Sequence, residues 1–193
     1  ENAEAYWNPD GTRLSFQRRA EDAGIPCDRI FVTVPDGPSV QVSNGRGVTT
    51  CAYFMPDGKS VLYASTHGLM DACPPPLDPA EFKRLGYFWR VFPEYDIWIQ
   101  DLAGGEPRRL TDTLGYDAEA TVSPRGDRIV FTSVRSGDLE RWTCDLDGAN
   151  LVQVTHTPGY DGGAFFSHDG TQLIFRSQAW TLGKEAEEQA FHH

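Results

Sequence analysis

The sequence lacks several features that would assign it to a well-defined functional class. It contains no run of 18 apolar residues, so its pattern excludes a membrane-spanning helix. Its four cysteines show no Cys-x-x-Cys spacing, which excludes the common zinc and thioredoxin-type motifs. It also has no Gly-x-Ser-x-Gly segment, the nucleophile elbow of α/β hydrolases.

Positive charge is scarce as well. The chain has 17 Lys and Arg residues against 28 Asp and Glu residues, which gives a formal net charge of -11. Nucleic acids and anionic lipid surfaces attract proteins through Lys and Arg, so this balance argues against both kinds of partner. The simplest interpretation of the acidic balance is that it keeps the protein in solution.

The first residues show neither an initiator methionine nor the apolar stretch of a signal peptide, and Ala3 to Trp7 already has a strand pattern. We therefore expect the chain to begin inside a folded unit. Either a leader has been removed, or the sequence is a piece of a longer protein.

The four cysteines leave the disulfide pairing open. Cys27, Cys51 and Cys73 fall in segments that could meet near one edge of the molecule, and they could pair if the protein is exported. Cys144 lies in the middle of an expected strand, where a lone packed thiol is the simpler interpretation.

A short turn motif recurs four times and is the most informative feature of the chain. Each copy precedes an apolar strand-like run, and the copies are 47, 68 and 44 residues apart. A period in the forties that is built from short strands is typical of propeller blades. The four copies are Pro9-Asp10-Gly11, Pro56-Asp57-Gly58, Pro124-Arg125-Gly126 and His168-Asp169-Gly170.

Each repeat divides into a strand before the turn, an apolar strand after it, an alternating third strand and a short fourth strand. The sequence therefore predicts an all-β propeller with about three and a half four-stranded blades, which is a partial or open ring. In the turns we expect Gly58, Gly126 and Gly170 to have positive φ. The expected blades are 1–50, 51–117, 118–162 and, for half of a fourth, 163–178.

Two segments interrupt this regularity. The second blade carries an insertion at 66–94 with a helix candidate at 78–85, and its end is rich in aromatic residues, including Tyr87 and Trp89. A long aromatic loop on a regular repeat is a candidate binding surface, although its rings could equally pack on a neighbouring blade. The chain closes with a polar helical tail at 179–193.

The pattern of strand, Ser-Pro-Asp-Gly turn, apolar strand, Asp-Gly turn and Arg-Leu-Thr resembles the repeat of TolB-like β-propellers. The best copy runs from Thr121 to Ser133 and continues to Asn150, and the resemblance covers nearly the whole chain. It implies a periplasmic or secreted bacterial protein that binds a partner through its propeller surface. Similar repeats occur in prolyl-oligopeptidase-type hydrolases and metal-dependent polysaccharide lyases. The chain also lacks the recognisable N-terminal α/β domain of TolB itself.

Acidic residues recur at matched distances from the turns, which points to a candidate metal site. Asp117 and Asp161 are equivalent to each other, and so are Glu4 and Glu119. Clustered carboxylates at one end of the propeller channel could hold Ca²⁺ or another divalent cation. The alternative is that each Asp bonds the backbone of its own loop.

The remaining candidates belong to a partner or ligand surface. Tyr116 and Tyr160 follow glycine in two nearly identical loops and are expected to pack between blades. His67 and His156 stand at loop starts without a metal-binding spacing, so both are expected on the surface.

We expect a non-enzymatic, exported scaffold for protein interactions, with no cofactor beyond the cation considered above. Its open blade edges could also allow self-association. The alternative is a carbohydrate-binding or metal-dependent glycan-cleaving propeller, or the propeller domain of a larger hydrolase, because aromatic faces suit sugars and acids suit cation-assisted chemistry.

Overall fold

The computed structural model describes residues 1–75, 78, 80, 83–84, 90–181 and 183–184. It contains three four-stranded antiparallel sheets and one two-stranded sheet, which confirms the predicted fold class of an open propeller with about three and a half blades. Blade 1 consists of β1 (Asn2–Trp7), β2 (Leu14–Ala20), β3 (Ile25–Thr33) and β4 (Val40–Gln41). Blade 2 consists of β5 (Thr49–Phe54), β6 (Ser60–Ser65), β7 (Asp96–Asp101) and β8 (Arg108–Arg109). Blade 3 consists of β9 (Asp117–Val122), β10 (Ile129–Ser133), β11 (Glu140–Cys144) and β12 (Val152–Gln153), and blade 4 of β13 (Gly159–Phe166) and β14 (Leu173–Ala179).

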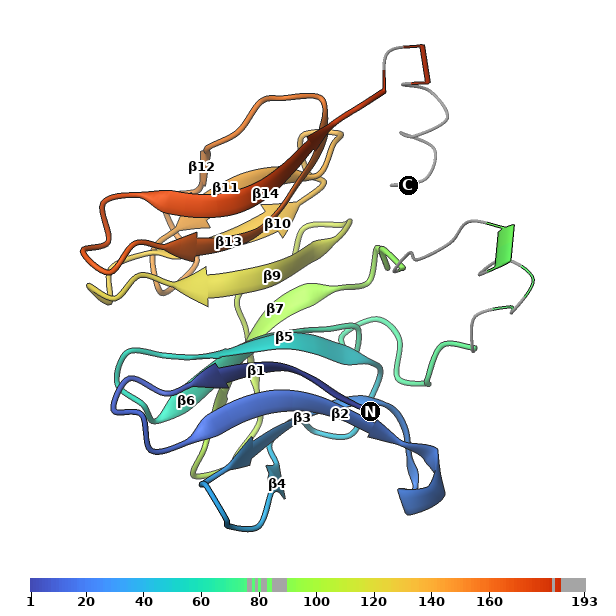
Figure 1. Ribbon diagram of the computed structural model, residues 1–193, viewed down its shortest axis with the longest axis vertical. Coiled ribbons are helices and arrows are strands. Elements are labelled where there is room, and N and C mark those ends of the chain that lie inside the picture. The colour runs from blue at the N-terminus through green and yellow to red at the C-terminus, as the bar shows by residue number, and fades with distance from the viewer. Residues whose placement is uncertain (76–77, 79, 81–82, 85–89, 182, 185–193) are drawn as a thin grey trace.

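The blades follow one another as an open arc. Figure 1 shows the sheets in chain order, from blade 1 in blue to blade 4 in red, with the first strand of each blade facing its neighbours. Each blade is a meander, because its strands pair in sequence order. In the described residues the only helix that is fully placed is the 3₁₀ turn η1 (Glu21–Ala23), which follows β2.

The turns between the first two strands have the predicted backbone. Gly58, Gly126 and Gly170 have φ values of 64°, 69° and 67°, in the left-handed region that glycine adopts without steric cost. In each turn the glycine N–H donates to the carbonyl three residues earlier, as Gly126 does to Ser123 at 2.8 Å.

Gly126→Val is expected to lower the free energy of unfolding by more than about 1 kcal/mol, because a β-branched residue is strained at this φ. A Cβ at this position would also lie 3.4 Å from the Pro56 ring. Urea unfolding measures the loss. Gly126→Asn is the matched control, because Asn tolerates the left-handed region, and equal stability of the Val variant and the parent would contradict this account of the turn.

Apolar packing joins the first three blades. One cluster lies between blades 1 and 2 and centres on Ile30, Phe54 and Tyr63, and a second lies between blades 2 and 3 and centres on Ile97 and Phe131. Ile30 and Ile97 occupy equivalent positions, because each carbonyl accepts from the start of the loop after the fourth strand. Burial of these side chains is what fixes each blade against the next.

A third apolar cluster lies near the loops that join successive blades. Tyr116 and Tyr160 are buried there beside Tyr95, so the two tyrosines pack between blades and their expected place on a partner or ligand surface is wrong. Phe92, from the end of the insertion, packs on the same cluster with its ring 5.7 Å from that of Tyr95. The packing alternative therefore holds for this aromatic residue.

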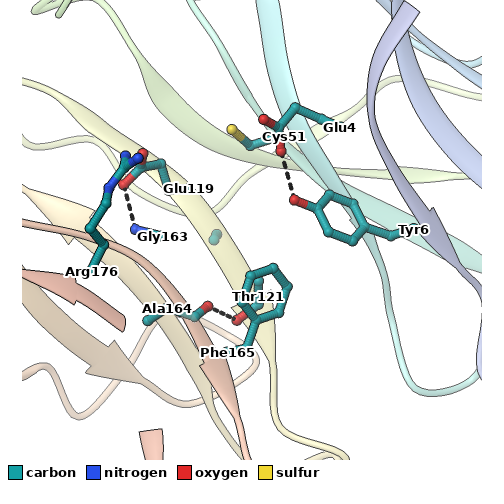
Figure 2. A pocket seen from close by; sticks show the side chains of 10 residues that line it. Glu4, Tyr6, Cys51, Glu119, Thr121, Gly163, Ala164, Phe165 and Arg176 are labelled. Carbon is teal, nitrogen blue, oxygen red and sulfur yellow. Dashed lines mark hydrogen bonds between the residues drawn. The ribbon is translucent and has the colours of Figure 1, made fainter. Parts of the chain in front are cut away.

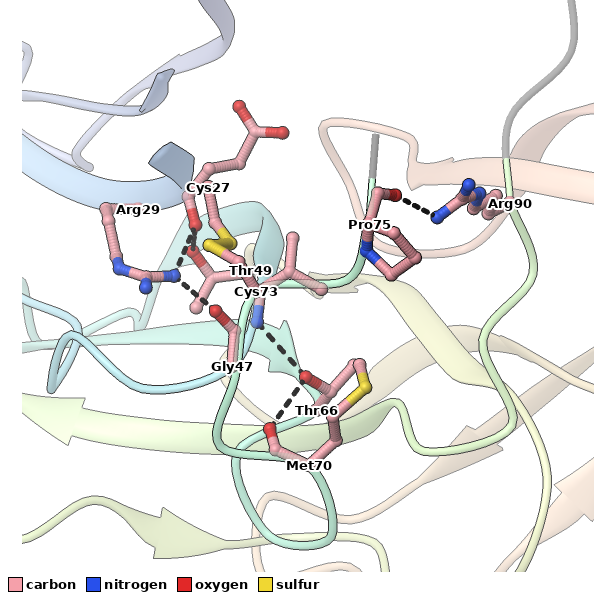
Figure 3. The surroundings of a disulfide bond; sticks show 11 residues. Cys27, Arg29, Gly47, Thr49, Thr66, Met70, Cys73, Pro75 and Arg90 are labelled. Carbon is pink, nitrogen blue, oxygen red and sulfur yellow. Dashed lines mark hydrogen bonds between the residues drawn. A yellow bond between two sulfur atoms is a disulfide. The ribbon is translucent and has the colours of Figure 1, made fainter. Parts of the chain in front are cut away.

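A disulfide joins the third strand of blade 1 to the insertion of blade 2. Cys27 and Cys73 form it, with their Cα atoms 5.7 Å apart (Figure 3). Nearby, Arg29 Nη1 donates to the Gly47 carbonyl, and Arg46 forms a salt bridge with Asp71 at 2.6 Å. Of the remaining two cysteines, Cys144 is a buried free thiol, as the sequence predicts.

The rest of the insertion falls partly outside the described residues. Arg90 Nη1 donates to the Pro75 carbonyl at 2.6 Å, which ties the two ends of the segment together. Tyr87 and Trp89 lie outside the described residues, as do part of the helix candidate at 78–85 and nearly all of the tail from 182 onward. Within the described part of the chain, no helix has the length and apolar character needed to cross a membrane.

Candidate functional site

Each innermost strand is interrupted at the same place by a β-bulge. The ladders between the first two strands shift register there in all four blades. The residue five positions before the turn has positive φ in every blade, although three of the four are not glycine. A bulge of this kind redirects its side chain. The four residues are Glu4 (52°), Cys51 (52°), Glu119 (55°) and Gly163 (60°).

The four bulge residues line one cavity of about 280 Å³, here called the channel pocket. Figure 2 shows Glu4 and Cys51 on one side of it and Glu119, Gly163 and Arg176 on the other. The full lining is Glu4, Tyr6, Cys51, Glu119, Ala120, Thr121, Gly163, Ala164, Phe165 and Arg176.

Two aromatic rings, those of Tyr6 and Phe165, line the part of the pocket nearer the turns, and a third ring packs against them. Tyr6, Tyr53 and Phe165 stand three residues before their respective turns, and the Tyr6 ring lies 5.6 Å from each of the other two. Contact between Tyr6 and Phe165 brings the first strand of blade 1 close to the first strand of blade 4 across the pocket. In blade 3 the same position holds Thr121, whose hydroxyl donates to the Ala164 carbonyl at 2.7 Å.

The Glu119 carboxylate is held by several donors on its own wall. Oε2 accepts from the Thr132 hydroxyl at 2.5 Å and from the Gly163 N–H at 2.9 Å, and Oε1 accepts from the Tyr160 hydroxyl at 2.9 Å. The guanidinium of Arg141 lies behind it, with Nη2 3.5 Å from Oε2. The hydrogen-bond donors to the Glu119 carboxylate therefore come from the protein itself.

Arg141 is a fully buried charge in an interface that is apolar elsewhere. It occupies the position of Ile30 and Ile97, since its carbonyl accepts from Val154 in the same pattern. Burial lowers the pKa of its guanidinium, while the negative charge of Glu119 acts in the opposite direction. The ion pair lies within blade 3, and Tyr160 and Gly163 of blade 4 donate hydrogen bonds to its carboxylate, so polar contacts join blades 3 and 4 where the earlier blades use apolar side chains.

Glu4, on the opposite wall, is exposed and far less occupied. Its Oε2 accepts from the Tyr6 hydroxyl at 2.6 Å. The pKa of Tyr6 is raised by burial first and then by this bond to Glu4. The pKa of the Cys51 thiol is raised by burial and then by the charges of Glu119 and Glu4. Both groups therefore experience a negative potential in the pocket.

The structure separates the four acids of the expected metal site into two places. Glu4 and Glu119 line the channel pocket, whereas Asp117 and Asp161 do not line it. Asp117 is buried and forms a salt bridge with Arg135 at 2.7 Å, an arrangement that neither sequence alternative includes. Asp161 is buried at the equivalent position of blade 4. Burial raises the pKa of Asp117, and Arg135 opposes this rise.

Among the described residues, no group of three or more His, Cys, Asp or Glu side chains is arranged to hold a metal ion. The divalent cation therefore stays a prediction.

His67 is buried, with only 4% of its surface exposed, so its expected place on the surface is wrong. Its Nδ1 lies 2.7 Å from the Ser65 hydroxyl, and its ring centroid lies 3.9 Å from that of Trp98. The loop that follows β6 turns back over the sheet, which the sequence pattern did not reveal. His156 is exposed, as expected.

His67 is expected to make stability depend on pH. Burial, with the nearby positive charge of Arg46, lowers its pKa from 6.5 to about 4. A group with a depressed pKa in the folded state stabilises the protein at a pH above its unfolded pKa, and this stability is lost as the pH falls from about 6.5 to about 4. Urea unfolding should show a loss of about 1–2 kcal/mol over this window. His67→Phe should remove that part of the pH dependence, and an identical pH profile in parent and variant would refute the assignment.

Two pocket residues were missed at the sequence level, although the signal was present. Cys51 and Gly163 stand five residues before their turns, just as Glu4 and Glu119 do. A thiol and a glycine suggest no shared chemistry with two carboxylates, so residue type alone does not group the four positions. Arg176, Tyr6 and Phe165 were missed because no motif marks a side chain that points into a channel.

No protein-family model matches the sequence. Among solved structures, the chain is similar to a protein described as TolB from Agrobacterium tumefaciens, with a TM-score of 0.69 at 21% identity over 89% of this chain. It is also similar to TolB from Acinetobacter baumannii, with a TM-score of 0.69 at 19% identity over 93% of this chain. A third similar structure is an oligogalacturonate lyase in complex with manganese, with a TM-score of 0.57 at 15% identity over 91% of this chain.

These likenesses show the fold, which is a TolB-like β-propeller, as the repeat predicts. This chain spans 52% and 38% of the two TolB chains and 44% of the lyase.

Proposed function

We propose that this protein is an exported, non-enzymatic β-propeller that acts as a scaffold for protein interactions. A partner polypeptide would bind at the two faces where the arc of blades ends. The observation that carries this proposal is the exposure of apolar side chains on those faces, at positions that blade packing buries elsewhere in the same chain.

Blade 4 supplies one of these faces. Ile174 stands four residues after the turn glycine and is 72% exposed. Leu62 and Val130 occupy the equivalent positions of blades 2 and 3 and are both fully buried. Within the described part of the chain, the strand that carries Ile174, β14, is also an edge strand, whose outer backbone groups can pair with another strand.

Blade 1 supplies the other face. Trp7 stands two residues before its turn and is 53% exposed, whereas the equivalent Phe54 and Val122 are 2% and 5% exposed. Tryptophan is enriched at the centres of protein interfaces because it offers a large contact area with few rotatable bonds. Apolar surface of this kind favours a polypeptide partner.

The disulfide supports the exported part of the proposal. Disulfides form and persist in oxidising compartments such as the bacterial periplasm and the extracellular space. The Cys27–Cys73 bond links the third strand of blade 1 to the insertion of blade 2, so it contributes to the architecture of the arc. The TolB-like fold also supports export, by analogy.

Photo-crosslinking tests the proposal. A photoreactive amino acid is placed at Trp7 or Ile174, and the protein is expressed with an export signal in a bacterial host. The matched control is the same replacement at Leu114, which is 84% exposed and lies in the loop between β8 and β9, which joins blades 2 and 3. We expect discrete crosslinked polypeptides, including a second copy of the chain, from the first two positions and none from Leu114. The same products from all three positions, or none from the end faces, would overturn the proposal.

A further inference from the structure

The channel pocket has a polar composition that selects a particular kind of group. Its two walls carry two carboxylates and one exposed guanidinium, and the aromatic rings of Tyr6 and Phe165 lie at its turn side. The chemistry it can offer a ligand depends on which of these groups already has a partner within the protein.

The wall made by blades 3 and 4 is internally paired. Glu119 accepts hydrogen bonds from Thr132, Tyr160 and Gly163, and Arg141 lies against it. Arg176 donates to the Tyr160 hydroxyl at 3.0 Å, and its guanidinium lies over the Tyr160 ring at 5.1 Å. The positive charges of this wall are therefore held against groups of the same wall.

The wall made by blade 1 is different, because the Glu4 carboxylate is exposed and, among the described residues, accepts its hydrogen bond from Tyr6. The bulge turns Glu4 toward the pocket, as Figure 2 shows. It shares the pocket with the rings of Tyr6 and Phe165, whose centroids lie 5.6 Å apart. A carboxylate in a pocket that also presents aromatic rings can bind an ammonium or guanidinium group, through charge and cation–π attraction.

We propose that the channel pocket receives a cationic side chain, lysine or arginine, from a partner polypeptide, with Glu4 as its counter-charge and Tyr6 and Phe165 as its aromatic cradle. The inference rests on the proposed function in that the ligand belongs to a polypeptide, but it concerns a different surface from the end faces. A hard metal ion would need about six oxygen ligands, whereas one available carboxylate backed by rings suits an organic cation. The net charge of -11 favours approach of such a group at long range.

The test uses short peptides and the whole chain. The isotope-labelled protein is titrated by NMR with acetyl-Gly-Lys-Gly-amide and acetyl-Gly-Arg-Gly-amide. The neutral counterparts carry norleucine and citrulline, which keep the size of each side chain and remove its charge. We expect the cationic peptides to shift the signals of pocket residues such as Cys51 and Gly163, and to bind at least about tenfold more tightly than the neutral ones (about 1.4 kcal/mol).

Variants separate the pocket from general electrostatics. Glu4→Gln should weaken the cationic peptides about tenfold or more, whereas Glu106→Gln makes the same charge change in an exposed turn and should leave their affinity unchanged. Phe165→Leu keeps apolar bulk without the aromatic face and should weaken binding by a smaller factor. Melting curves of all three variants establish that they are folded.

Three results would overturn the inference: equal binding of neutral peptides, unchanged affinity in Glu4→Gln, or preferential occupation of the pocket by Ca²⁺, Mn²⁺ or a neutral oligosaccharide. If these peptides fail while crosslinking from Trp7 and Ile174 succeeds, the pocket inference is wrong and the scaffold function stands. If the peptides bind and the end faces give no crosslinks, the pocket inference stands and the proposed binding at the end faces is wrong.

Discussion

Glu119→Gln should lower the free energy of unfolding by about 3–5 kcal/mol, because it leaves the buried guanidinium of Arg141 without its counter-charge. The amide also places an N–H group among donors, since Thr132, Tyr160 and Gly163 all donate to this carboxylate. Urea unfolding of the variant and the parent measures the loss.

Glu4→Gln is the matched control for this prediction, because it makes the same chemical change at the equivalent bulge of blade 1. Glu4 is exposed and bonds one neighbour, so its replacement should alter stability by less than about 0.5 kcal/mol. A double variant, Glu119→Gln with Arg141→Met, should recover much of the loss, because the uncompensated charge is gone. Equal effects of Glu4→Gln and Glu119→Gln would show that Arg141 does not depend on Glu119.

Loss of the Cys27–Cys73 disulfide is expected to cost about 4 kcal/mol, since the bond closes a segment of 46 residues in the unfolded chain. The Cys27→Ser, Cys73→Ser double variant should therefore unfold at a lower urea concentration than the oxidised parent. Reduction with dithiothreitol should lower the stability of the parent to that of the variant and leave the variant unchanged. Identical midpoints for oxidised and reduced parent protein would refute a stabilising role for this bond.

The two buried charge pairs and the disulfide mark where this arc departs from simple apolar blade packing. Blades 1 to 3 are joined by clusters around Ile30 and Ile97, whereas the junction of blades 3 and 4 contains Arg141 in place of isoleucine. Burial of a charge costs free energy unless it is paired, so the order of this junction depends on Glu119. The same residue lines the channel pocket, where its hydrogen bonds and its ion pair come from the protein itself.

Local sequence patterns determined the blades. The turn motif at 56–58, 124–126 and 168–170 requires a left-handed glycine, and the apolar run after each turn, with the alternating third strand, is typical of strands. Both patterns involve residues that are neighbours in the sequence, so the residues of each blade are enough to predict its strands. The expected packing of Tyr116 and Tyr160 succeeded for the same reason, because the two loops repeat one pattern.

The tertiary structure alone decided the contacts between residues far apart in the chain. It selected Cys73 as the partner of Cys27 and left Cys51 free in the channel pocket, although the sequence made all three candidates. It paired Asp117 with Arg135, buried His67 against Trp98 and brought Tyr6 to Phe165 across the pocket. The strand pattern specifies which residues share a face of one sheet, but the curvature of the arc specifies which blades face one another, and that curvature comes from the packing of all the blades together.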